Sequence, residues 1–121
     1  MEKPHKKLDA WQLAVELAIH VYRTSDRFPK DERFGLTDQM RRAAVSIPSN
    51  VAEGAARKSK KEFSRFIHTA RGSLSELDTQ LELAHRLGFL DEGTWKDLDD
   101  RMKRVDMTLA GLLRFQRSSH V

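Results

Sequence analysis

The chain has 121 residues, of which 33% are charged, and its 22 Lys and Arg against 18 Asp and Glu give a net charge of +4. This length is typical of one folded domain, and the absence of cysteine excludes disulfides and thiolate metal sites. No apolar run approaches the ~20 residues that span a membrane, and the basic N-terminus lacks the apolar segment of a secretory signal. We therefore expect one cytoplasmic domain over residues 1–121, with flexible tails at 1–7 and 118–121 and no membrane partner.

Apolar residues recur every three or four positions almost throughout the chain, which predicts an all-α fold. The expected helices cover residues 8–25, 36–57, 60–87 and 92–117. Thr37 is a candidate N-cap for the second helix and Asp91 for the fourth. Ser59 and Glu62 fit a capping box at the start of the third helix, and Gly88 suits its C-terminal end. Connections of ~3–10 residues favour an antiparallel, up-down four-helix bundle.

The first expected helix has an unusually broad apolar surface. Its polar residues crowd into an arc of about 80°, while apolar residues spread over roughly 240°, more than twice what one core face needs. An exposed strip of this kind marks an interface, so we predict a homo-oligomer that associates through this helix. The alternative is that neighbouring helices of the same chain cover the strip. The candidate interface residues are Trp11, Leu13, Leu17 and Val21.

The second expected helix contains Pro48 in its middle. Proline removes a backbone donor and crowds the carbonyl one turn earlier, which a helix interior normally avoids. The apolar residues on either side of Pro48 nevertheless keep one helical register, which favours a single helix kinked at Pro48 over two helices that meet there. Ser46, Ser49 and Asn50 can supply hydrogen bonds near the bend.

Basic residues gather at the start of the third expected helix. Residues 57–71 hold six basic groups against one acid, and Lys58, Lys61 and Arg65 fall opposite the apolar stripe, where solvent should be. Such a face can neutralise phosphates of RNA or DNA, with an ordinary solvated helix face as the alternative. Because no base-reading motif is present, binding would go through the nucleic-acid backbone. The candidate contact residues are Arg41, Arg42, Arg57, Lys58, Lys60, Lys61, Arg65 and Arg71.

The patterns of enzymes and metal proteins are weak in this chain. Glu82 and His85 have the E-x-x-H spacing of di-iron bundles, but the chain has no second such pair. It also lacks a nucleophile elbow and a glycine-rich phosphate loop. We therefore predict no catalytic residue, no metal and no cofactor. Trp11 and Trp95 open apolar stripes near helix ends, where packing is favoured over stacking on nucleobases.

Three segments, FGLTDQMRRAAVSIPSNVAEG, SKKEF and ARGSLSEL, resemble the 23S rRNA intervening-sequence protein family, in a match from Trp11 to Leu90. The resemblance implies an antiparallel four-helix bundle that assembles as a homopentamer, and it carries over no catalytic residues. It also brings in the accessory variability proteins of diversity-generating retroelements, which look like basic pentameric barrels that bind nucleic acid and a reverse transcriptase. Two functions thus stay open: a nucleic-acid-binding oligomer, and a scaffold that docks a protein partner such as a reverse transcriptase.

Overall fold

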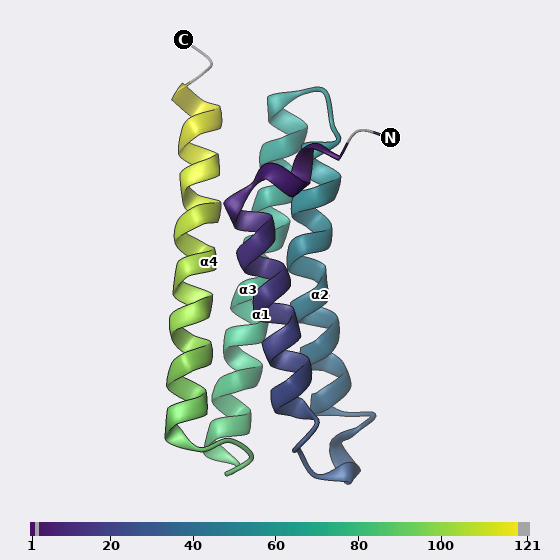
Figure 1. Ribbon diagram of the computed structural model, residues 1–121, viewed down its shortest axis with the longest axis vertical. Helices are drawn as coiled ribbons and strands as arrows, with labels where there is room; N and C mark the ends of the chain where they lie inside the picture. Colours follow the sequence, from purple (N-terminus) through teal and green to yellow (C-terminus); the bar gives the residue numbers. More distant parts are fainter. Residues whose placement is uncertain (2, 119–121) are drawn as a thin grey trace.

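The computed structural model describes residues 1 and 3–118, which form four long α-helices in an antiparallel bundle (Figure 1). The helices are α1 (Asp9–Ser25), α2 (Leu36–Ala55), α3 (Lys60–Arg86) and α4 (Glu92–Ser118). Each helix packs against the next in sequence, and α4 closes the bundle against α1. The predicted all-α, up-down architecture is confirmed, and every helix bound lies within two residues of its expected position.

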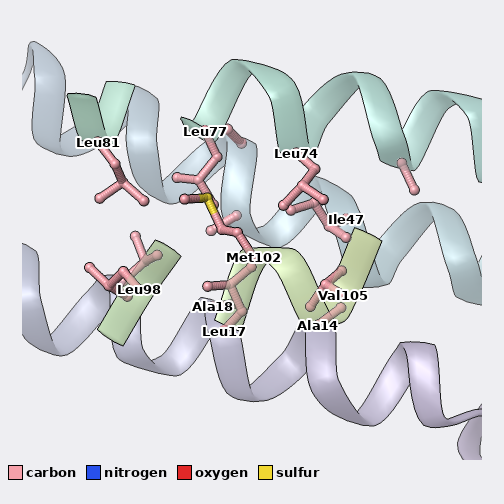
Figure 2. Close-up of a cluster of buried hydrophobic side chains, with 14 of the residues drawn as sticks. Ala14, Leu17, Ala18, Ile47, Leu74, Leu77, Leu81, Leu98, Met102 and Val105 are labelled. Atoms are coloured by element: carbon pink, nitrogen blue, oxygen red, sulfur yellow. The ribbon is translucent and has the colours of Figure 1, made fainter. Parts of the chain in front are cut away.

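The hydrophobic core runs along the centre of the bundle and receives side chains from all four helices. Figure 2 shows Leu17 of α1, Ile47 of α2, Leu77 of α3 and Leu98 of α4 pointing into the space between the helices. Each of these side chains is at most 1% exposed, so their burial supplies hydrophobic stabilisation. Within the described residues, no helix is both long and apolar enough to cross a membrane.

α2 runs without interruption through Pro48, which confirms one helix rather than two. Asn50 Nδ2 donates to the carbonyl oxygen of Ser46 at 2.8 Å and to Ser46 Oγ at 3.0 Å. Ser46 Oγ also lies 2.8 Å from Ser73 Oγ of α3, whereas the side chain of Ser49 is exposed. The side chains of Asn50, Ser46 and Ser73 therefore connect the proline-containing part of α2 to α3.

Helix ends follow the predicted capping chemistry at α3 and α4. Ser59 Oγ accepts a hydrogen bond from the Glu62 N–H at 3.0 Å, and Asp91 Oδ1 accepts one from the Thr94 N–H at 2.7 Å. The Thr94 N–H favours the ionised carboxylate and so holds the pKa of Asp91 below its ordinary value. Gly88 follows α3 with φ of +79°, the left-handed geometry that a glycine adopts without strain.

The start of α2 differs from the prediction. Thr37 lies inside the helix and is buried, so it is not the N-cap; Gly35 occupies that position and has no side chain to offer. The first helical N–H, that of Leu36, instead donates to Glu32 Oε1 at 3.2 Å. Glu32 ends the short 3₁₀-helix η2 (Lys30–Glu32) in the α1–α2 connection and thus caps α2 from outside.

The N-terminal segment also differs from the flexible tail that we expected at residues 1–7. Pro4–Lys7 form the 3₁₀-helix η1, which packs against α1 and α2. Gln12 Nε2 donates to the carbonyl oxygen of Lys6 at 3.2 Å, and the rings of His5 and Trp11 meet edge to face at 5.0 Å. At the other terminus Ser118 belongs to α4, and residues 119–121 of the expected tail lie outside the described residues.

Candidate nucleic-acid interface

The predicted basic residues do not form one continuous surface. Arg41 and Arg42 lie near the start of α2, whereas Arg57 and Lys58 follow its end, and a rise of about 1.5 Å per residue separates the two pairs by more than ~20 Å. Arg71 lies three turns into α3. The other five candidates surround the α2–α3 connection at one end of the bundle, the upper end in Figure 1: Arg57, Lys58, Lys60, Lys61 and Arg65.

Arg41, Arg42 and Arg71 have carboxylate partners within the chain. Arg41 pairs with Asp26 at 3.0 Å, donates to Ser25 Oγ at 2.9 Å and so ties α2 to the end of α1. Arg42 pairs with Asp38 one turn earlier in α2 at 3.0 Å, and Arg71 pairs with Asp106 of α4 at 2.9 Å. The three arginines are therefore placed by intramolecular contacts, away from the five residues around the α2–α3 connection.

The fold brings three further lysines to that connection. η1 packs against α2 and lies at the upper end of the bundle in Figure 1, the end that also carries the α2–α3 connection; it contains Lys6 and Lys7, and Lys3 directly precedes it. All three lysines are exposed. The basic run at the N-terminus was visible in the sequence, but only the packing of η1 shows where it lies. We call the eight residues together the basic end: Lys3, Lys6, Lys7, Arg57, Lys58, Lys60, Lys61 and Arg65.

The two segments that carry the basic end account for the entire net charge of the chain. Residues 1–9 and 53–65 hold eight Lys and Arg against four Asp and Glu, whereas the whole chain has 22 against 18. The remaining residues are thus balanced, with 14 of each sign. A net charge confined to one end produces a directional field that attracts polyanions.

Arg57 and Arg65 are held by an aromatic ring. The guanidinium carbon of Arg57 lies 4.9 Å from the centroid of the Phe66 ring, and that of Arg65 lies 5.8 Å from the same centroid. Both distances are within the range of cation–π attraction. Both arginine side chains are exposed, while Phe66 is half-buried.

The predicted oligomer interface needs correction. Leu17 and Val21 are 1% and 0% exposed in the core of the single chain, so their side chains are not available to a second copy. Trp11 and Leu13 are half-buried and pack against the same core. Neighbouring helices therefore cover most of the broad apolar arc of α1, because the bundle encloses this helix on two sides.

Part of that arc nevertheless remains on the surface. Ile19 and Tyr22 of α1 and Val45 of α2 are 42%, 43% and 42% exposed. They border an apolar groove of about 390 Å³ between α1 and α2, which we call the α1–α2 groove. It is lined by Val15, Ala18, Ile19, Tyr22, Arg23, Val45 and Pro48.

Glu82 and His85, which have the E-x-x-H spacing, form contacts with other side chains. Glu82 accepts from Arg86 Nε at 2.9 Å, and His85 Nε2 lies 2.9 Å from Glu92 Oε2 of α4. The His85 ring also stacks on Trp95 at 4.4 Å, which closes the α3–α4 corner. Within the described residues, no three or more His, Asp or Glu side chains are grouped as metal ligands.

Comparisons with known proteins agree with this architecture. The family described as 23S rRNA-intervening sequence protein matches residues 6–111. A crystal structure of a protein with unknown function from the S23 ribosomal protein family of Bacteroides thetaiotaomicron superposes with a TM-score of 0.77 at 18% sequence identity. The match covers 86% of this chain and 97% of that one, and at this identity it supports the fold alone. No curated protein sequence matches the chain.

Proposed function

The chain belongs to the 23S rRNA-intervening sequence protein family, and on that premise we propose that it is a non-enzymatic, homo-oligomeric bundle that binds RNA or DNA. The basic end makes the contacts, and they go to the phosphate backbone rather than to base edges. Copies associate through the α1–α2 groove, and five is the number that the sequence resemblance implies.

The observation that carries the proposal is the charge distribution. Residues 1–9 and 53–65, the segments that carry the basic end, have a net charge of +4, equal to that of the whole chain, at one end of a rod-like bundle. Lysine and arginine side chains in such a cluster displace counterions from a polynucleotide, which gives binding that weakens steeply with salt. A closed ring of identical subunits would repeat the basic end and strengthen its field.

Backbone contact is favoured by the kind of residues at the basic end. Six of its eight members are lysines, which bind phosphates as point charges without reading sequence. The tryptophans, which could stack on bases, are half-buried and lie against histidine rings of the same chain, Trp11 against His5 and Trp95 against His85. We therefore expect similar affinities for different sequences of one nucleic-acid type.

The test is fluorescence anisotropy with a labelled RNA stem-loop and a labelled duplex DNA, each at low and at physiological salt. The variant Lys58→Glu, Lys61→Glu, Arg65→Glu should lose at least about tenfold in affinity, because three attractive charges become repulsive. The control Lys30→Glu, Arg33→Glu, Lys96→Glu makes the same change in net charge at exposed positions away from the basic end, and should retain binding. Failure of the unmodified protein to bind either probe at low salt would contradict the proposal.

A second candidate function is a scaffold that docks a protein partner without binding nucleic acid itself. The α1–α2 groove favours it, since exposed Ile19, Tyr22 and Val45 could bind an apolar side chain of another protein. A purified partner that stays bound after nuclease treatment, and that Ile19→Lys releases, would favour the scaffold. A complex that nuclease dissolves would favour the nucleic-acid function.

A further inference from the structure

Arg57 and Arg65 differ from the arginines that pair with carboxylates elsewhere in the chain. Five arginines form ion pairs at 2.9–3.1 Å: Arg41, Arg42, Arg71, Arg86 and Arg101. Within the described residues, Arg57 and Arg65 have no such pair and instead lie against Phe66. An aromatic face attracts a guanidinium but does not use its N–H groups, whereas a carboxylate does.

The position of Phe66 follows from a close approach of α2 and α3 at Gly54. A Cβ atom on Gly54 would lie 2.9 Å from the Cβ of Phe66 and 2.9 Å from Cδ1 of Phe63, so only glycine fits. Phe66 therefore packs directly beside the last turn of α2. Arg57 follows three residues after Gly54 and reaches the ring from the α2–α3 connection, while Arg65 reaches it from α3.

We propose that Arg57 and Arg65, oriented by Phe66, are the residues of the basic end that hold nucleic-acid phosphates by paired N–H···O bonds. This inference rests on the proposed function and assigns its specific contacts. A planar guanidinium offers two parallel donors to two phosphate oxygens, and orientation in advance lowers the entropy lost on binding. The lysines of the basic end contribute charge alone.

Exchanging both arginines for lysine tests this assignment, because the exchange keeps every charge. For Arg57→Lys, Arg65→Lys we expect affinity for the labelled RNA stem-loop to fall on the order of tenfold at fixed salt. The slope of log affinity against log salt should stay the same, since the number of neutralised phosphates is unchanged. The matched control Lys58→Arg, Lys61→Arg should show no loss.

A second variant, Phe66→Leu, keeps both arginines and removes the ring that orients them. We expect a loss of about three- to fivefold in affinity, again with an unchanged salt slope. Thermal unfolding checks that this variant folds; if it does not, the double lysine variant decides, because Arg57 and Arg65 are exposed. Equal affinity of the double lysine variant and the unmodified protein would overturn the assignment and leave the proposed function standing. Absence of binding by the unmodified protein would remove the proposed function itself.

Discussion

Gly54 and Phe66 pack so closely that the space for a single methyl group is missing between them. The hypothetical Cβ of Gly54 would lie 2.9 Å from the Phe66 Cβ and 3.3 Å from the carbonyl oxygen of Phe63, which belongs to the backbone. Relief would require α2 and α3 to move apart, because a backbone atom cannot rotate away. The contact therefore sets the spacing of the two helices at the basic end.

Gly54→Ala should destabilise the protein by about 1–3 kcal/mol through overpacking, despite the higher helix propensity of alanine. Gly72→Ala is the control, since it lies in α3 with open space where its Cβ would be. This second change should stabilise by about 0.5–1 kcal/mol. Urea denaturation followed by circular dichroism measures both, and equal effects of the two changes would refute the close-packing argument.

Asp91 predicts a specific pH dependence. Its pKa is lowered in the folded state by hydrogen bonding to Thr94, so its contribution to stability is complete above the unfolded-state pKa and is lost as pH falls through the folded pKa. Asp91→Asn keeps a capping side chain that does not titrate. The stability advantage of the unmodified protein over this variant should be constant above about pH 5 and shrink below about pH 4. Urea denaturation across this range measures it, and a difference that does not change with pH would contradict the assigned cap.

Ser46 and Ser73 join α2 to α3 by a half-buried hydrogen bond of 2.8 Å next to Pro48. Ser73→Ala should cost about 0.5–1.5 kcal/mol, because Ser46 Oγ loses that partner. In a double-mutant cycle, the loss in free energy of unfolding for Ser46→Ala and Ser73→Ala together should be smaller than the sum of the two single losses by roughly 0.5–1 kcal/mol. Strict additivity would mean that the hydroxyl contact contributes nothing to the stability of the proline-containing turn.

Periodicity predicted the helices and the core stripes, and local residue preferences predicted two of the N-caps. Repeats of three and four fix which face of α3 is buried, and local rules fix Ser59 and Asp91, since a cap depends only on residues within one turn. The prediction of Thr37 as the N-cap of α2 is wrong, because Glu32, in a separate 3₁₀-helix, accepts the hydrogen bond from the first N–H of α2. No local pattern around Thr37 reveals that contact.

The candidate site was less predictable because it depends on contacts between distant segments. Residues 57–65 were found from the charge run, but Lys6 joins them only through the packing of η1. Arg71 fell in the same run of sequence, yet it turns toward Asp106 of α4, 35 positions away. On a helical wheel, Leu17 and Val21 belong to an apolar arc that is wider than one core face needs, but two neighbouring helices bury both side chains.

Because Leu17 and Val21 are buried, the candidate residues for self-association become Ile19 and Val45, which face solvent in the α1–α2 groove. If copies associate there, Ile19→Lys, Val45→Lys should raise the dissociation constant on the order of a hundredfold, because two apolar side chains lose burial and two charges would have to be desolvated. Both side chains are already 42% exposed, so the variant should fold.

Light scattering at micromolar concentration measures this effect. The control is Leu87→Lys, which places a lysine at an exposed apolar position outside the groove, since Leu87 is 59% exposed at the end of α3. The unmodified protein and the control should have the same multi-copy mass, and the groove variant the mass of one copy. A single-copy mass for the unmodified protein would refute self-association. Dissociation of the control to the same extent as the groove variant would instead place the contact outside the groove. Because the groove lies on the sides of α1 and α2 and the basic end at their tips, loss of the proposed association should weaken nucleic-acid binding without altering the contacts that each copy makes.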